Sequence, residues 1–218
     1  MKKFAKSAVF TALFILISSV TSNAASVPLL VNRQNPLPES YVPSDMTAVD
    51  CTRPDGREKQ RLVREAALAL DEMLSDLNAL FGGTPVTVTS GYRSFEYQSA
   101  LFRLATDDAV SRGNTTEEAK KIAGRYTAPP GTSEHQSGLA ADLHDLPCAS
   151  VKFAESEKFS WLCHHAHEYG FILRYPKGKE DITGYCFEPW HWRYVGDIAP
   201  EIHESGLCLE EYIKNLKK

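Results

Sequence analysis

The 218-residue sequence has no surplus of positive charge, no pair of cysteines at CxxC spacing and no internal repeat or low-complexity segment. Lysine and arginine number 24 against 28 for aspartate and glutamate, which gives a formal net charge of -4. We therefore expect no nucleic-acid partner, because that function usually needs a clustered excess of cations. The missing CxxC pair argues against a zinc site built from thiolates. The length allows one domain with a short leader or arm.

The sequence also lacks an apolar run of the roughly 20 residues that a membrane-spanning helix requires. The apolar stretch Ala8 to Val20 is shorter than that, follows three lysines and precedes the small residues Ser22-Asn23-Ala24. This order is typical of a secretory signal peptide. We expect residues 1–24 to be cleaved, with a membrane anchor as the alternative. The mature protein would then be exported to the periplasm or cell-wall space, or secreted, with no transmembrane segment.

Export changes the interpretation of the five cysteines, which are Cys51, Cys148, Cys163, Cys186 and Cys208. An oxidising compartment favours disulfides between such residues. Their number is odd, so at least one must be free or paired outside the chain. The spacing alone does not determine the pairing.

The organisation of the mature chain follows from its periodicity and punctuation. Residues 25–56 are rich in proline, asparagine and serine, which predicts an extended arm or a linker ahead of a domain over residues 57–218. Apolar spacing and caps predict helices over residues 57–80, 94–113, from 115, 156–169, 200–204 and 209–216. Alternation predicts strands over residues 86–89, 139–143, 171–175, 183–187 and 190–195. Helices and antiparallel strands are segregated, so the predicted class is α+β: a small antiparallel sheet flanked by helices.

Two histidines and an aspartate form the most informative pattern in the chain. His135 and Asp142 lie in PPGTSEHQSGLAADL, and His191 follows about fifty positions after Asp142 in EPWHW. Catalytic zinc is commonly held by three such ligands, and the fourth position is left to water, whose pKa falls to about 7. Glu188, three residues before His191, would be the base for that water. A regular strand would point Glu188 and His191 to opposite faces, but Pro189 favours a bulge or bend that brings both to one pocket.

Simpler interpretations of the same residues remain open at this point. His191 could be incidental among core aromatics, and Arg93 could be a surface charge rather than a group that stabilises an oxyanion. His144 shares a strand face with Asp142 and is a candidate for contact with the metal ligands. The remaining histidines are interpreted as surface or packing residues: His164, His165, His167 and, with no partner visible, His203.

The sequence resembles the VanY-type zinc D-alanyl-D-alanine carboxypeptidases, a group that includes murein L,D-carboxypeptidases and endopeptidases. The resemblance runs from about residue 89 to 196 and is carried by SGYRSFEYQ, SEHQSGLAADL and EPWHWRYVG in the expected order. It implies one zinc ion per chain, in a cleft on the sheet, with His135, Asp142 and His191 as ligands. It also implies that Glu188 is the catalytic base and that Arg93 stabilises the transition state.

The resemblance further implies a substrate and the residues that bind it. Gln98, Ser133, Tyr175 and Trp190 occupy positions that line the peptide cleft in relatives. The implied function is removal of the C-terminal D-amino acid from peptidoglycan stem peptides. The alternatives are a murein endopeptidase and, in another class, a non-catalytic wall-peptide-binding module with a structural zinc. The choice between a D,D and an L,D bond and the oligomeric state stay open, and the five cysteines and the proline-rich arm depart from the family pattern.

Overall fold

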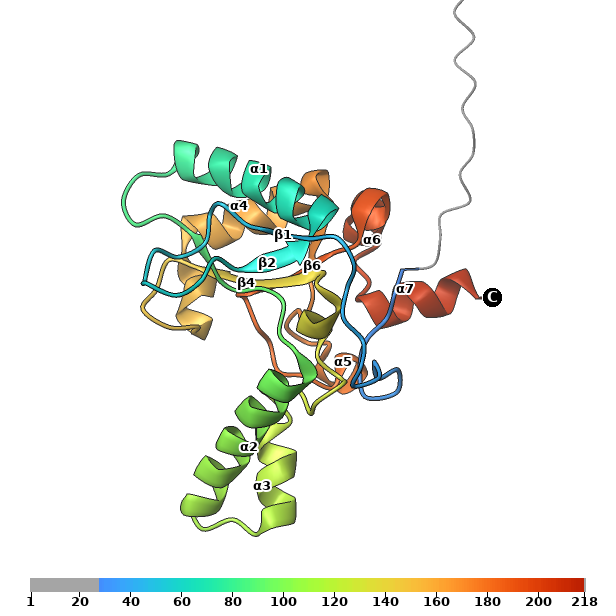
Figure 1. The fold of residues 1–218 in the computed structure, drawn as a ribbon. Coiled ribbons are helices and arrows are strands. Elements are labelled where there is room, and N and C mark those ends of the chain that lie inside the picture. The colour runs from blue at the N-terminus through green and yellow to red at the C-terminus, as the bar shows by residue number, and fades with distance from the viewer. Residues whose placement is uncertain (1–27, 218) are drawn as a thin grey trace, which may run out of the picture.

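A four-stranded antiparallel sheet lies at the centre of the computed structural model, which describes residues 28–217 (Figure 1). Its order is β3-β4-β6-β5, formed by Thr87–Ser90, Ala140–His144, His191–Tyr194 and Phe171–Leu173. A separate two-stranded sheet joins β1 (Met46–Ala48) to β2 (Arg61–Val63). The predicted α+β class is confirmed. The expected signal peptide, residues 1–24, lies outside the described residues.

Helix α1 (Arg64–Leu80) covers the sheet because one of its faces is apolar (Figure 1). The buried residues of that face are Ala66, Ala67, Leu70, Met73, Leu74 and Leu77. They form one core with Val88, Leu143 and Trp192 from the sheet. Burying apolar surface of this kind yields roughly 25 cal/mol per Å² removed from water. This core gives the sheet a rigid back, and the site described below lies on its other side.

Helices α2 (Phe95–Ser111) and α3 (Thr116–Ala123) form a hairpin that projects from the body (Figure 1). The Ser94 side chain accepts a hydrogen bond from the backbone N–H of Tyr97 and caps α2. Thr115 and Glu118 form the reciprocal capping box that the sequence predicts for α3. Both helix starts are therefore determined by local hydrogen bonds to otherwise unpaired backbone donors.

The remaining elements are short. The other helices are α4 (Glu157–His165), α5 (Glu180–Thr183), α6 (Ala199–Ser205) and α7 (Leu209–Leu216). The 3₁₀ turns are η1 (Glu134–Ser137) before β4, η2 (Val151–Glu155) before α4, η3 (Ala166–Tyr169) after α4 and η4 (Gly196–Ile198) before α6. Helices α6 and α7 form a second core against the sheet edge at Ile172. The C-terminal helices thus pack beside β5, as an extension of the body.

One predicted helix starts later than expected, and one predicted strand is wrong. The helix predicted over residues 57–80 begins only at Arg64, because residues 61–63 pair with the arm strand β1 instead. The strand predicted over residues 183–187 is absent: Thr183 ends α5, and Gly184 follows in the left-handed region with φ 79°. A residue in the left-handed region interrupts an extended strand. Glycine adopts this conformation readily, whereas other residues rarely do.

The segment before residue 57 is an arm that contacts the body along its described length. Val31 and Val49 are fully buried. The Leu37 N–H donates to the Gly131 carbonyl at 2.7 Å, and the Gln136 amide donates to the Pro38 carbonyl at 2.9 Å. These contacts favour a wrapped arm over a free linker. The boundary near residue 56 stays a prediction.

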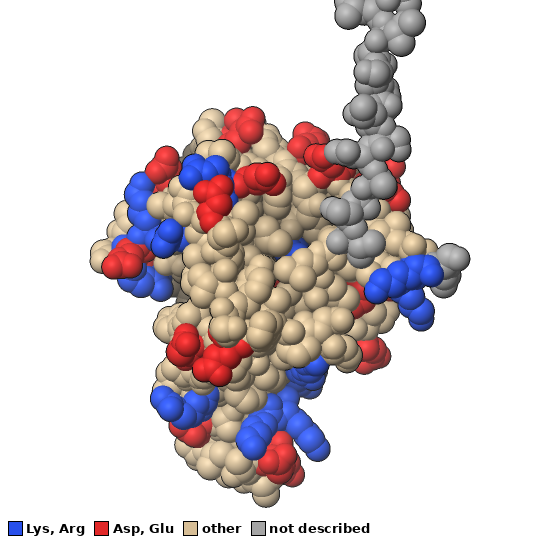
Figure 2. All heavy atoms as spheres, turned by 45° about the vertical axis from the view of Figure 1, so that its right-hand side comes forward, with Lys and Arg blue, Asp and Glu red and all other residues tan. Residues whose placement is uncertain are grey.

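The disulfides expected from export are not found among the described residues, where all five cysteines are free thiols. They lie on five separate segments of the chain, and the fold brings no two of them into a bond. Within residues 28–217, no helix is long and apolar enough to cross a membrane. On the face drawn in Figure 2, basic and acidic side chains are interspersed around an uncharged centre.

Candidate metal centre and active site

The β4–β6 pairing places two of the expected ligands side by side. Asp142 on β4 lies directly opposite His191 on β6 in the antiparallel register, so their side chains share one face. His135 comes from η1, which precedes β4. Gly138 ends η1 in the left-handed conformation, with φ 69°, and turns the chain into the strand. A Cβ at this glycine would lie 3.1 Å from the Pro43 ring, so the turn also requires a residue without a side chain.

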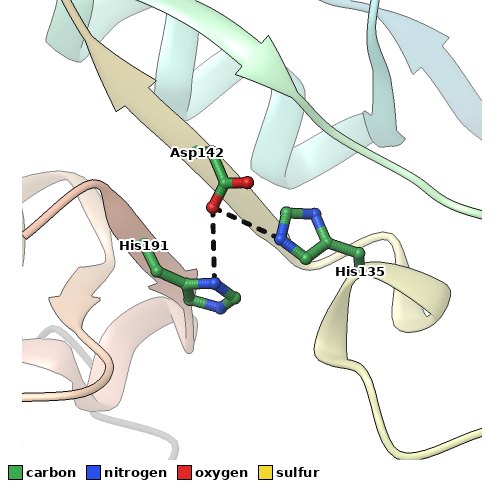
Figure 3. A group of neighbouring side chains, drawn as sticks. All are labelled: His135, Asp142 and His191. Carbon is green, nitrogen blue, oxygen red and sulfur yellow. Dashed lines mark ion pairs between the residues drawn. The ribbon is translucent and has the colours of Figure 1, made fainter. Parts of the chain in front are cut away.

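His135, Asp142 and His191 point toward one another (Figure 3). Asp142 Oδ1 lies 3.4 Å from His135 Nε2 and 3.4 Å from His191 Nδ1. The ligand atoms of the three residues all lie within 4.8 Å of one another, and no other such group of three occurs in residues 28–217. Asp142 Oδ1 and His135 Nε2 are buried without a hydrogen-bond partner. Buried polar atoms left unpaired are costly, so this arrangement fits a cation that all three would bind.

The contacts of the two imidazoles indicate which nitrogen of each faces the ligand position. His135 Nδ1 lies 2.7 Å from the Gly91 carbonyl and donates to it, which leaves Nε2 unprotonated. His191 Nε2 lies 3.6 Å from Glu134 Oε2, and its Nδ1 faces Asp142. Such outer contacts fix the tautomer and orientation of metal-binding histidines. A Cβ at Gly91 would lie 2.7 Å from the Arg61 carbonyl, so the close approach at that position requires glycine.

The electrostatics of the three ligands also suit a cation. Burial and the neighbouring Arg93 lower the pKa of His135 to about 4, which keeps its ring neutral. Burial alone would lower the pKa of His191, but Asp142, Glu134 and Glu188 outweigh it and raise that pKa to about 9. Burial alone would raise the pKa of Asp142, but the two histidines hold it well below its ordinary value. Asp142 and His135 are thus held in the forms that bind metals, a carboxylate and a neutral imidazole, whereas His191 would release a proton when a cation binds.

Glu188 lies beside the metal-binding group. The chain turns at Pro189 and Trp190, and the His191 N–H donates to the Glu188 carbonyl at 3.2 Å. Because of this bend, Glu188 Oε2 lies 3.6 Å from His191 Nδ1, although a straight strand would separate them. Burial raises the pKa of Glu188 to about 8, and Asp142 acts in the same direction while His191 and Arg93 oppose it. A carboxyl group in this state is suited to exchanging a proton near neutral pH.

A small cavity of about 30 Å³ opens beside this group. Its walls include Glu188, His191, Ser133, Tyr175, Tyr185 and Tyr126. The Tyr175 ring packs on the His191 ring with 4.7 Å between centroids and on the Tyr185 ring at the same distance. The cavity is therefore narrow, and several of its walls carry hydroxyl groups that donate hydrogen bonds.

Two of the expected substrate-binding residues do not line this cavity. Gln98 is buried behind it and donates to the Ala128 carbonyl at 2.7 Å, and its Oε1 has no partner. Trp190 is half-buried, and its carbonyl accepts from the Leu143 N–H. Ser133 and Tyr175 do line the cavity. A direct contact with a ligand in the small cavity is therefore supported for two of the four.

Arg93 lies between the small cavity and a larger one, and lines both. Its backbone N–H donates to the His135 carbonyl at 3.2 Å, which fixes it beside η1. Within residues 28–217 its guanidinium forms no ion pair, and its Nε is buried without a partner. An unpaired, held cation next to a metal site is able to stabilise negative charge that develops on a ligand.

The other histidines lie apart from the metal-binding group. His144 Nδ1 lies 2.9 Å from the Leu146 carbonyl and 3.1 Å from Arg53, and no bond to Asp142 is formed. His167 and His203 stack on each other with 4.0 Å between ring centroids. The sequence alone showed no partner for His203. The expected contact between His144 and the metal ligands is thus not found in the described part of the chain.

A buried ion network behind His191 is the feature that sequence reasoning missed. Glu134, fully buried, accepts from Arg174 Nε at 2.8 Å and from Arg193 Nη1 at 2.7 Å. Arg174 also binds Glu210 on α7 through both terminal nitrogens, at 2.8 and 2.6 Å. Burial would raise the pKa of Glu134, but the two guanidiniums outweigh it. The available signal was an arginine among apolar residues in each of two predicted strands, Arg174 and Arg193. A cation that is buried in a sheet requires an anionic partner.

Replacing Glu134 by alanine is expected to destabilise the fold by about 3–5 kcal/mol, because it leaves the buried Arg193 without a counter-ion and Arg174 with Glu210 alone. Chemical denaturation of the two proteins would measure this. Glu117→Ala is the matched control, since Glu117 forms only an exposed ion pair with Lys120 and should change stability little. A Glu134→Ala protein as stable as the control would contradict a structural role for the network.

Comparison with known proteins gives consistent matches over most of the chain. A family model described as VanY, D-alanyl-D-alanine carboxypeptidase, matches residues 59–197. A putative carboxypeptidase of Bacillus subtilis, YodJ, is 39% identical over 202 residues, which cover 90% of this chain and 70% of that protein. A D-alanyl-D-alanine carboxypeptidase of Enterococcus faecalis is 36% identical over 190 residues, 87% of this chain and 66% of that protein.

Solved structures match the fold as well. The structure of the LD-carboxypeptidase LdcB is similar with a TM-score of 0.73 and 38% identity, and the match covers 85% of this chain and 84% of that one. A mutant of the vancomycin-resistance D,D-pentapeptidase VanY, in complex with Zn(II), is similar with a TM-score of 0.70 and 37% identity, covering 85% and 97%. Residues 59–197, which match the family model, contain every residue of the metal-binding group.

Proposed function

The chain belongs to the VanY family of D-alanyl-D-alanine carboxypeptidases. We therefore propose that it is a zinc-dependent carboxypeptidase that removes the C-terminal D-amino acid from peptidoglycan stem peptides. The observation that carries the proposal is the buried group of His135, Asp142 and His191 with Glu188 beside it. A wall substrate places the enzyme outside the cytoplasmic membrane, which agrees with the expected signal peptide.

The donor atoms fit zinc. His135 Nε2, Asp142 Oδ1 and His191 Nδ1 would hold the ion, since three ligands of this kind leave one position open for catalysis. When bound, zinc polarises a scissile carbonyl and lowers the pKa of water. The Glu134–Arg174–Arg193 network fixes the Glu134 carboxylate 3.6 Å from His191 Nε2, on the side of the ring away from Asp142.

The other residues supply the proton transfer and the charge stabilisation. A carboxylate oxygen of Glu188 accepts a proton from the attacking water. Glu188 then passes this proton to the leaving amine. The unpaired guanidinium of Arg93 stabilises the oxyanion that forms from the carbonyl oxygen when water attacks. The hydroxyls of Ser133 and Tyr175 would hold the terminal carboxylate in the small cavity.

Two other functions are less well supported. An endopeptidase needs room beyond the terminal residue, but tyrosines form several walls of the small cavity. A wall-binding module with structural zinc normally has four protein ligands, whereas three are found here among the described residues. The buried Glu188 would also have no task in such a module.

Digestion of defined muropeptides tests the function and the bond. Purified zinc-loaded enzyme is incubated with tetrapeptide and pentapeptide muropeptides, with and without a chelator, and mass spectrometry identifies the residue released. We expect loss of one terminal D-alanine that the chelator abolishes. Cleavage of the pentapeptide alone would indicate a D,D bond and cleavage of the tetrapeptide an L,D bond. Release of internal fragments, or no release, would contradict the proposal.

A further inference from the structure

A second, larger cavity of about 690 Å³ adjoins the metal-binding group, and Arg93 lines it as well as the small cavity. It shares Asp142 with the metal-binding group and Arg93 with the small cavity. One wall comes from the arm and the residues after it, including Arg53, Arg57 and Glu58. Arg53 and Arg57 precede residues 59–197, the part of the chain that matches the family model.

Arg53 is held rigidly in that wall. Its Nη2 donates to the His144 carbonyl at 2.9 Å, its Nε to the Thr87 hydroxyl at 3.2 Å and its Nη1 to the Pro147 carbonyl at 3.4 Å. All of these acceptors are uncharged, and Arg53 forms no ion pair within residues 28–217. Asp55 is near enough for Arg53 to help lower its pKa, but the Asp55 carboxylate hydrogen-bonds to Arg57 and not to Arg53. The half-buried Arg53 guanidinium is therefore fixed in place and hydrogen-bonded to no carboxylate of the described chain, which suits it to bind one from a ligand.

The neighbouring charges differ from Arg53 in ways that matter. The charge of Arg57 is already offset by Asp55, which accepts hydrogen bonds from it through both carboxylate oxygens. The distance from Arg57 Nη2 to Asp55 Oδ2 is 2.5 Å. Glu58 on the same wall has no cationic partner among the described residues. The wall therefore presents one unpaired cation and one unpaired anion to the cavity. Such a pair complements a ligand that carries both a carboxylate and an ammonium group.

The position of the cavity identifies which part of a peptide would enter it. If the small cavity holds the terminal residue, the scissile carbonyl lies at the metal-binding group. The residues on the N-terminal side of that bond then extend past Arg93 into the larger cavity. Its volume is sufficient for several residues, within the range of typical ligand pockets.

We infer that Arg53, assisted by Glu58, is a specificity-determining residue that binds a zwitterionic side chain on the N-terminal side of the scissile bond. This inference rests on the proposed function. The chemistry favours stem peptides whose third residue is a diamino diacid, with a free carboxylate and a free ammonium at its end, over peptides with a diamino monoacid such as lysine at that place. Only the first kind offers Arg53 a carboxylate at the end of its third side chain.

Two stem peptides that differ only in the third residue, meso-diaminopimelate or L-lysine, test the inference with the zinc-loaded full chain. We expect wild-type kcat/KM to be about tenfold to a hundredfold higher for the diaminopimelate peptide, since a charge-assisted contact of this strength changes binding by that factor. Arg53→Gln should bring the ratio of the two values close to one. Arg53→Lys should restore part of the ratio, because it keeps the charge without the planar fork.

Arg64→Gln is the matched control, because Arg64 is an exposed arginine that pairs with Asp45 and lines neither cavity. It should leave the ratio within about threefold of wild type, which is smaller than the expected effect of removing the Arg53 charge. A ratio near one in the wild-type enzyme would overturn the inference but not the proposed function. An Arg53→Gln enzyme that is slower on both peptides with an unchanged ratio would show a purely structural role and overturn it too. Cleavage of neither peptide by the wild-type enzyme would overturn the proposed function itself.

Discussion

Replacing Glu188 by glutamine is expected to lower kcat by about 10²–10⁴, the range that general base catalysis contributes. Glutamine has nearly the same shape, so it fits the buried position, but its amide does not accept a proton from water. The three metal ligands are untouched, so the protein should keep its zinc. Steady-state rates on the muropeptide that the wild-type enzyme cleaves, together with metal analysis of the same preparation, would measure both effects.

Glu168→Gln serves as the control for this experiment. Glu168 is an exposed carboxylate that pairs with His165, away from the metal-binding group, and its replacement should leave kcat unchanged. If Glu188→Gln turned over at the wild-type rate, another group would have to be the base. If it lost its zinc, Glu188 would be part of the metal site and its assignment as base would be wrong.

Replacing Asp142 by asparagine is expected to abolish activity by releasing the metal. The carboxylate is the one anionic donor of the group and faces both histidines at 3.4 Å. Changes to residues that only support metal ligands cost about 10–100-fold in affinity, so loss of a ligand charge should weaken zinc binding by more than about a hundredfold. Competition with a chromogenic chelator would give the zinc affinity, and the muropeptide assay the residual rate.

Asp145→Asn is the matched control, because Asp145 follows the same strand but binds Lys158 at 3.0 Å instead of facing the histidines. That variant should retain wild-type zinc affinity. An Asp142→Asn protein that bound zinc as tightly as the control would contradict the ligand assignment. The comparison separates loss of a ligand from loss of any buried carboxylate near the end of β4.

Several features of this protein follow from local sequence alone. Thr115 and Glu118 close a capping box within four residues, and the structure confirms it. The apolar spacing in residues 57–80 predicts the buried face of α1 except at its end, where Leu80 is exposed. The motifs around His135, Asp142 and His191 identify the metal-binding group, because those residue types are the ones zinc prefers. In each case the information lies within one helix turn, one strand or one short motif.

The tertiary structure alone decided the rest. The start of α1 depends on β1, because residues 61–63 pair with β1 as a strand. The sequence of the helix itself gives no sign of this pairing. The placement of His191 opposite Asp142 depends on the register of two strands that are far apart in the chain. Glu134 acquires two cationic partners only when β5 and β6 close over η1.

Sequence therefore determined which chemistry this protein carries and most of its helices, while the tertiary structure decided which charges meet. The physical reason is that caps and periodicity act over a few residues. Burial, strand register and charge pairing depend on contacts between distant segments, and their energies appear only when those segments pack.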